Sequence, residues 1–338
     1  RDKFVEGARR MTQKLDTLER LNKMADKNKF TVEDLDWSRP ISSNRLWGPE
    51  IIAPLSYLPA YNLLNEEERR RLNQLFSVGV CEQVIWLEEN ILVRTLRKAL
   101  PHWSVSGELR TALENFIDEE LKHTEMFWRT LEKAAPEWYP SRQFHLFKIS
   151  KPQAFALNRV INNPDLLLVW IWTAIYFEER TVNYCQLYRR ACRADPDSLD
   201  PTFVDLHEYH FKDEVRHFQL DQYLLTECYD GQPRWKRRLA GRMFYHVMKS
   251  YTAPRRTSLR ILEIMGQEFP RLKQSIIPEF LHQIPSLATN SSFHRMAFSR
   301  ESSPRSMELF ARYDELDCLW PLFVMEDRDG SKPQELRP

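Results

Sequence analysis

The feature that most limits how this chain can fold is a Glu-x-x-His motif that occurs twice, as Glu120 with His123 and again as Glu214 with His217. Residues three apart project from one face of an α-helix, so the carboxylate and imidazole of each motif can ligate the same ion. Each motif lies in the second of two consecutive long helical stretches. Two such hairpins predict a four-helix bundle in which the motifs face each other, with one further Glu from each of the first helices.

The composition agrees with an all-α chain. Only eight glycines occur among 338 residues, and no long stretch shows the apolar–polar alternation that is typical of strands. We predict one domain over residues 1–326, with additional N- and C-terminal helices around the core bundle at about 66–228, and a disordered tail at 327–338. The predicted bundle helices cover about 66–99, 107–134, 165–193 and 199–228. Shorter helices are expected near 3–24, 233–251, 255–268, 270–284 and 303–315, and irregular connectors at 37–64 and 140–164.

Charge and hydropathy exclude several classes of protein. A formal net charge of +1 gives no sign of nucleic-acid binding, and the short basic run "RWKRRLAGR" is interpreted as the solvated start of a helix. The longest apolar run, at 166–177, is shorter than the roughly 20 residues that a membrane-spanning helix needs, so no membrane association is expected. Five scattered cysteines without a CxxC pair indicate reduced thiols and a cytoplasmic protein.

The first helix of each hairpin must supply one more carboxylate. In "CEQVIWLEENILVRTL", Glu88 lies near the middle of the apolar helix face and Glu89 lies further round, which favours Glu88. In "YFEERTVNY", helical phase does not separate Glu178 from Glu179, because that helix is apolar on most sides. The stretch resembles the "QERAT" segment of acyl-carrier desaturases, in which the Glu before Arg is a ligand, and this resemblance favours Glu179. Either carboxylate is costly in so apolar a helix unless it is paired or metal-bound.

A third histidine, His210, lies on the same narrow stripe of the helix as the second motif, four residues before its glutamate. Ordinary sites of this plan contain two histidines and four carboxylates, so His210 indicates a site with more nitrogen ligands. Asp213 and Glu119 point to the side of the motifs, and each is expected to hold a ligating histidine of the opposite helix through its second ring nitrogen. Asp221 could do likewise, and His207 lies at the edge of the stripe.

The pattern His-x-x-x-Glu-x-x-His, formed by His210, Glu214 and His217, resembles the signature of the p-aminobenzoate N-oxygenase family. Glu120 with His123 resembles the first motif of that family, and the resemblance covers about residues 66–228. It implies a ferritin-like bundle that binds two iron ions and uses O2 to convert an amine, expected to be an arylamine, to a hydroxylamine, nitroso or nitro product. Carried over by position, the implied metal ligands are Glu88, Glu120, His123, Glu179, His210, Glu214 and His217.

Two alternatives stay open. The same metal pair could perform C-hydroxylation, desaturation or halogenation of an aliphatic or carrier-bound substrate, or the chain could be a ferritin-like or radical-generating subunit. Manganese suits the same ligands as iron. The expected partners are a small-molecule amine and an external electron donor such as a ferredoxin with its reductase, and a homodimer stays open. Arg295 and Arg300 are candidate anchors for a substrate carboxylate, because guanidinium groups bind carboxylates through two parallel hydrogen bonds.

Overall fold

The structure is a computed structural model that describes residues 16–105, 107–252 and 254–323. Every regular element in this part of the chain is a helix, and an isolated parallel bridge joins Leu46 to Leu199. The all-α prediction is confirmed. Residues 16–27 are helical, as expected for the first helix. The start of that helix and the expected tail at 327–338 lie outside the described residues.

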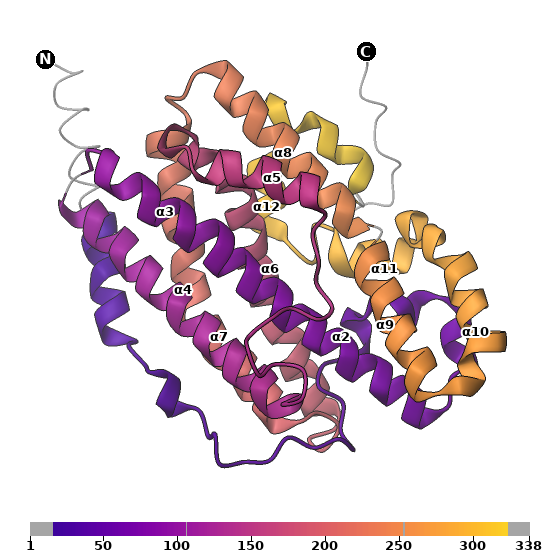
Figure 1. The fold of residues 1–338 in the computed structure, drawn as a ribbon. Coiled ribbons are helices and arrows are strands. Elements are labelled where there is room, and N and C mark those ends of the chain that lie inside the picture. The colour runs from indigo at the N-terminus through magenta and orange to yellow at the C-terminus, as the bar shows by residue number, and fades with distance from the viewer. Residues whose placement is uncertain (1–15, 106, 253, 324–338) are drawn as a thin grey trace, which may run out of the picture.

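Four long helical segments lie side by side and form the bundle (Figure 1). Local sequence sets where they begin: Asn65 caps the first in a capping box with Glu68, and Asp200 caps the last. The predicted bounds agree with them to within a few residues. The segments are α2 (Glu66–Leu87), continued by the π-helical η5 (Glu88–Val93) and by α3 (Arg94–Ala99); α4 (Gly107–Ala134); the 3₁₀-helical η7 (Pro164–Trp170) continued by α6 (Ile171–Ala194); and α7 (Pro201–Leu224), continued by the π-helical η8 (Leu225–Tyr229).

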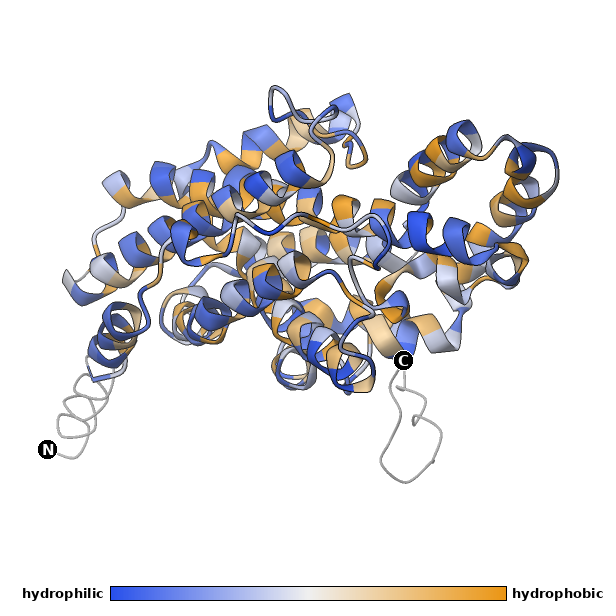
Figure 2. Cartoon of the chain, turned by 90° about the horizontal axis from the view of Figure 1, so that it is seen from below, coloured by the Kyte–Doolittle hydropathy of each residue, from blue (hydrophilic) through white to orange (hydrophobic). Residues whose placement is uncertain are grey.

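Large apolar side chains fill the space between these helices. Phe127 of α4 and Trp172 of α6 are both fully buried, and burial of an apolar side chain of this kind contributes on the order of 2 kcal/mol. Hydrophilic and hydrophobic residues alternate along most helices, as an amphipathic pattern requires (Figure 2). The π-helical turn of η5 begins at Glu88, in the middle of the first segment. Single π turns inside α-helices occur frequently at functional sites, and this one lies at a predicted ligand.

The remaining helices pack outside the bundle, where the structure corrects three details of the prediction. The expected connector at 140–164 contains a helix, α5, because Ser150 and Gln153 form a capping box at its start. A short helix, α11, was not expected, and the helix expected at 303–315 is divided into α12 and the 3₁₀-helical η10. The outer helices are α5 (Lys151–Ile161), α8 (Arg234–Thr252), α9 (Arg255–Glu268), α10 (Pro270–Gln283), α11 (Ser291–Ala297), α12 (Pro304–Phe310) and η10 (Asp314–Leu322).

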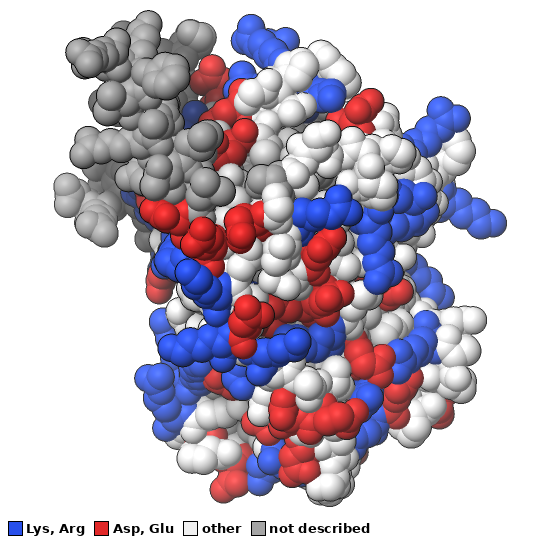
Figure 3. All heavy atoms as spheres, turned by 90° about the vertical axis from the view of Figure 1, so that its left-hand side faces the viewer, with Lys and Arg blue, Asp and Glu red and all other residues white. Residues whose placement is uncertain are grey.

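The connector at 37–64 contains only short 3₁₀ turns, among them η3 (Pro54–Tyr57) and η4 (Pro59–Leu63), which both begin at proline. Within the described residues no single helix is long and apolar enough to cross a membrane. By length and composition alone, α5 taken together with 164–194 passes that test as a pair bent by 116°. On the face shown in Figure 3, acidic and basic side chains lie next to each other and do not separate into large areas of one sign.

A buried carboxylate joins α2 to the chain between α4 and α5. Glu82 is fully buried, and its Oε1 accepts hydrogen bonds from the Tyr139 hydroxyl at 2.6 Å and from His145 N at 2.5 Å. Its Oε2 accepts from Leu146 N at 2.8 Å and Phe147 N at 2.5 Å. Hydrogen bonds to an ionised acceptor are about twice as strong as neutral ones. Glu82 therefore holds this connector against α2, and its role is structural.

We expect Glu82→Gln to lower the free energy of unfolding by about 3 kcal/mol, because the amide presents its NH2 group to backbone N–H donors and leaves them unsatisfied. The matched control is Glu89→Gln on the same helical segment, where the side chain is exposed and the change should stay within about 0.5 kcal/mol. Urea unfolding of the metal-free proteins, followed by circular dichroism, measures both. Equal midpoints for the two variants would contradict the structural role of Glu82.

Candidate metal centre

Seven buried side chains from the four bundle segments meet at one point between the helices. The four residues of the two Glu-x-x-His motifs and the third histidine come from α4 and α7, and one carboxylate comes from each of the other two segments. All seven are at most 5% exposed. The residues are Glu88 of η5, Glu120 and His123 of α4, Glu178 of α6, and His210, Glu214 and His217 of α7.

One half of this cluster surrounds His210 and His123. His210 Nε2 lies 2.9 Å from Glu88 Oε1 and 2.8 Å from Glu214 Oε1. His123 Nδ1 lies 3.3 Å from the same Glu214 oxygen and 3.6 Å from Glu120 Oε2. Ligand atoms of Glu88, His123, His210 and Glu214 all lie within 4.8 Å of one another, as the donors around a single ion do.

The other half surrounds His217. Its Nδ1 lies 3.1 Å from Glu120 Oε1 and 3.7 Å from both Glu178 Oε2 and Glu214 Oε1. Ligand atoms of Glu120, His123, Glu214 and His217 form a second group within 4.8 Å. Glu214 and His123 belong to both groups, and Glu120 reaches a histidine in each half. Shared carboxylates between two adjacent groups are the arrangement that a pair of bridged metal ions needs.

The donor atoms of the cluster fit metal ions because they have no other partner. Buried side-chain polar atoms are nearly always hydrogen-bonded, so a concentration of unpaired ones requires an explanation. Nδ1 of His123 and of His217, Nε2 of His210 and both oxygens of Glu120 lack a hydrogen bond, although all are buried. Imidazole and carboxylate together suit iron, manganese and zinc. The residues present therefore fit two ions of this kind.

The negative charges of the clustered carboxylates also repel one another, which raises the pKa of individual carboxyl groups. Burial raises the pKa of Glu88 well above its usual range, and the charges of Glu120 and Glu214 raise it further. Burial likewise raises the pKa of Glu214, partly offset by His217. Burial and the neighbouring His123 lower the pKa of His210, so that its imidazole is neutral with a free lone pair. Positive charge between these groups would relieve the repulsion and would be ligated by neutral histidine.

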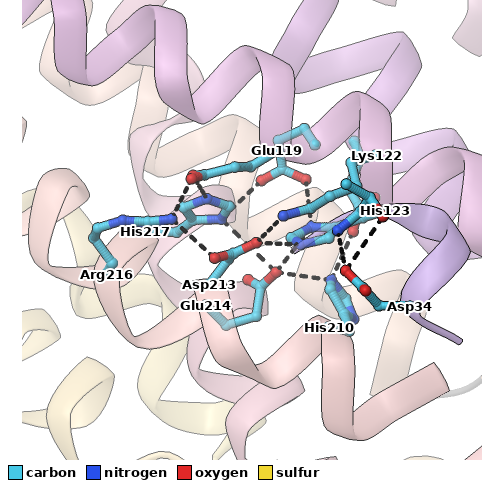
Figure 4. Close-up of polar contacts among 12 residues, drawn as sticks. Asp34, Glu119, Lys122, His123, His210, Asp213, Glu214, Arg216 and His217 are labelled. Atoms are coloured by element: carbon cyan, nitrogen blue, oxygen red, sulfur yellow. Dashed lines mark hydrogen bonds and ion pairs between the residues drawn. The ribbon is translucent and has the colours of Figure 1, made fainter. Parts of the chain in front are cut away.

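The histidines are oriented by acids from the opposite helix (Figure 4). His123 Nε2 lies 3.1 Å from Asp213 Oδ2, and His217 Nε2 lies 3.0 Å from Glu119 Oε2. In each pair the acid accepts the Nε2–H, so Nδ1 keeps its lone pair towards the cluster. The structure places Asp213 and Glu119 in the crossed positions that the sequence indicated.

Two cations complete this outer network. Arg216 Nη2 lies 2.5 Å from Glu119 Oε1 and 3.0 Å from Asp213 Oδ1, so one guanidinium bridges both acids. Lys122 Nζ donates to Asp213 Oδ2 at 2.6 Å. Burial alone would raise the pKa of Asp213, but the hydrogen bond from His123 and the nearby cations hold it below its usual range. Neither Arg216 nor Lys122 was singled out from the sequence, although both are adjacent to motif residues.

The structure corrects the choice between the two glutamates of α6. Glu179, which the sequence favoured, accepts hydrogen bonds from the backbone N–H groups of Arg305 at 2.9 Å and Ser306 at 2.7 Å, at the start of α12. Glu178 is the one that faces His217. In the first hairpin Glu88 lies in the cluster and Glu89 is exposed, in agreement with the prediction.

Asp221 and His207 both lie outside the cluster. Asp221 is 4% exposed and its Oδ2 has no hydrogen-bond partner, while the Nε2 of His217 faces Glu119. The His207 ring packs 4.3 Å from that of Tyr188, and burial lowers its pKa to about 4, as for a neutral core histidine. Burial raises the pKa of Asp221 and the charge of His217 partly offsets this, but no hydrogen bond joins the two among the described residues, so the orienting role of Asp221 stays a prediction.

A pocket opens onto the cluster from the side of α2, α6 and α9, and Glu88, Glu178 and Glu214 form part of its wall. Arg295 and Arg300, the expected carboxylate anchors, are exposed and do not line it. The arginine on its wall is Arg180, 8% exposed, which sequence reasoning missed. Arg180 follows Glu178 and Glu179 in an apolar helix, and a charged residue at such a position is a visible sign in the sequence of a functional role.

A helical bundle with paired Glu-x-x-His motifs and two further carboxylates defines a class, the di-metal carboxylate proteins. Within it, the family model described as p-aminobenzoate N-oxygenase AurF matches residues 11–260, which is most of the chain. The chain therefore belongs to this family, whose members are oxygenases of the di-iron type. No curated protein matches the chain in a sequence search.

We expect Glu178→Gln to lose metal and Glu179→Gln to keep it. The first change removes a charged donor that faces His217, whereas the second weakens only the hydrogen bonds to the start of α12. Metal analysis after loading with Fe²⁺ and gel filtration measures the ions per chain. A Glu179→Gln protein that is folded but metal-depleted would show that the cluster is assigned to the wrong glutamate.

Removal of an acid that orients a ligating histidine should lower the metal affinity of the cluster, although the acid is not itself a ligand. We expect Glu119→Gln to reduce metal affinity by about 10–100-fold, because His217 loses a charged acceptor for its second ring nitrogen. Competition with a coloured chelator gives the affinity. Glu114→Gln, on an exposed position of the same helix, is the control and should leave it unchanged.

Proposed function

We propose that this protein is an O2-dependent di-iron N-oxygenase that converts an arylamine to its hydroxylamine, nitroso or nitro product. The observation that carries the proposal is the third histidine: His210 Nε2 lies against both Glu88 and Glu214, which makes a set of three imidazoles and four carboxylates. Membership of the p-aminobenzoate N-oxygenase family supports the same reaction. The ligands proposed are Glu88, Glu120, His123, Glu178, His210, Glu214 and His217.

Two bound iron ions would supply the two-electron chemistry that activates O2. The side chains of the protein hold and insulate that centre. Asp213 and Glu119 fix the tautomers of His123 and His217, and Arg216 neutralises both acids. His210 adds a neutral donor, so the centre carries less negative charge than it would with a fifth carboxylate. This electron distribution suits attack by the lone pair of an amine.

The pocket beside the cluster supports an aromatic amine as substrate. Aromatic side chains such as Phe76, Phe177 and Phe298 lie in its wall beside aliphatic ones. Arg180 adds a positive charge: its Nη1 donates to the carbonyls of Met296 and Ala297, and no acid forms an ion pair with it within the described residues. An arylamine with an acidic group, such as p-aminobenzoate, matches a wall of this composition.

The overall reaction needs partners. For the first step, one amine, one O2, two electrons and two protons give one hydroxylamine and one water. We propose that the electrons come from a one-electron carrier of the ferredoxin or flavoprotein class, and that the enzyme works in the cytoplasm. The alternatives keep the same metal pair, and no feature of the pocket favours them. The hydroxyl of Tyr176, a candidate for a radical, donates to the carbonyl of Ala297 at 2.6 Å.

The direct test is to load the protein with Fe²⁺, add a reductant, O2 and p-aminobenzoate, and identify products by chromatography with mass detection. We expect the hydroxylamine first and more oxidised products later. A stable tyrosyl radical without amine oxidation would support the radical-generating alternative. A protein that binds less than one metal ion per chain would overturn the proposal as a whole.

A second test separates the third histidine from the rest of the site. We expect His210→Ala to retain both metal ions on the remaining ligands and to lose amine oxidation by at least about tenfold, which is about 1.4 kcal/mol in the barrier. His207→Gln, one helical turn earlier, should change turnover by less than about threefold, since that ring only packs in the core. Equal turnover of His210→Ala and the unchanged protein would show that His210 has no part in the reaction.

A further inference from the structure

A second cavity lies beside the metal cluster, and one of its wall residues packs on a ligand. Its wall contains Leu92, which also lines the pocket beside the cluster, so this side chain lies between the two spaces. Its wall also contains Phe116, whose ring packs 4.4 Å from the ring of His217. We call this space the inner cavity. Through Phe116 it lies next to the His217 half of the cluster.

The inner cavity also leads outward. Leu167 and Leu168 of η7 line it and at the same time line an outer cavity, whose wall includes His102 and Asp165, both exposed. The two leucines are half-buried, in a 3₁₀ segment at the bundle end. The outer cavity and the inner cavity thus form a series of adjacent spaces from the surface to Leu92, in which the two leucines form the wall that both cavities share. This series does not pass through the amine pocket.

The inner cavity has an apolar and uncharged wall. Leucine, isoleucine, alanine and aromatic side chains form nearly all of it, and the polar exceptions are Thr95 and Asp221. Burial raises the pKa of Asp221 well above its usual range, which favours the uncharged form of its carboxyl group. The oxygens Thr95 Oγ1 and Asp221 Oδ2 have no hydrogen-bond partner. Apolar cavities of this kind exclude ions and admit small apolar molecules such as xenon.

We propose that the inner cavity is the entry route of dioxygen to the metal cluster, with Leu167 and Leu168 at its gate. Dioxygen is a small apolar molecule, and the function proposed above, on which this inference rests, requires it. A bound arylamine fills the pocket in front of Glu88 and Glu178 and would obstruct that side. A separate apolar route lets dioxygen arrive while the amine is in place. Charged reductants and buffer ions do not enter through such walls.

Xenon tests the cavity without any metal or turnover. We expect crystals of the protein under xenon pressure to show a xenon atom between Leu92, Leu113 and Asp221, because xenon binds where dioxygen dissolves. Absence of xenon from the inner cavity, while it occupies other sites, would overturn the proposal. This result does not depend on iron binding, so it stays informative if the proposed function fails.

A variant at the gate tests the route itself. In Leu167→Trp the larger side chain narrows the passage at a half-buried position that can accommodate it. We expect the reduced iron-loaded variant to react with O2 about tenfold more slowly in stopped-flow absorbance, with unchanged metal content. In steady state the apparent KM for O2 should rise, while kcat at saturating O2 and the KM for the amine stay the same. Leu63→Trp, an exposed leucine of η4, is the control.

The outcomes separate the two proposals. If the unchanged protein binds iron and reacts with O2 at the same rate as a folded Leu167→Trp protein, the route is wrong and the N-oxygenase proposal stands. If the unchanged protein binds no iron, the N-oxygenase proposal fails, and the xenon experiment alone shows whether a gas-accessible cavity exists. Slower reaction in Leu63→Trp as well would assign the effect to general destabilisation and overturn the gate.

Discussion

The site depends on the crossed pairing of two histidines with two acids across α4 and α7. His123 reaches Asp213 and His217 reaches Glu119, so each helix supplies both a ligand and the acid that orients its neighbour's ligand. Arg216 touches both acids and offsets charges that would otherwise be buried without compensation. A shift of either helix along its axis would break both pairs together. The pairing therefore fixes the register of the bundle and the direction of the lone pairs.

The first segment of the bundle contributes side chains both to the metal cluster and to the two cavities beside it. Its π-helical turn runs from Glu88 to Val93, and it places a carboxylate in the cluster and Leu92 one turn later between the two cavities. An extra residue in a helical turn changes which side chains share a face. Here the change lets one short segment contribute to the metal cluster, the amine pocket and the inner cavity. Leu92 is thus a wall residue of both the substrate side and the proposed dioxygen side.

Much of this structure could be predicted because it is set by helical periodicity. The spacing of three or four residues places His210, Glu214 and His217 on one stripe in any helix, whatever surrounds it. The same rule favoured Glu88 over Glu89, because Glu88 lies near the middle of the face that Cys81, Ile85 and Leu92 form. The helix α5 was missed although its signal is local: Ser150 and Gln153 form a capping box that the sequence displays.

By itself the sequence determined the helices, the two motifs and the third histidine, since these follow from backbone geometry over a few residues. Only the tertiary structure decided between Glu178 and Glu179. The helix α6 is buried on several sides, so hydropathy has no preferred direction there, and the choice depends on α12. Its first amide groups, at Arg305 and Ser306, bind Glu179 and leave Glu178 for the cluster. Such a contact between distant segments has no signature in the local pattern of residues.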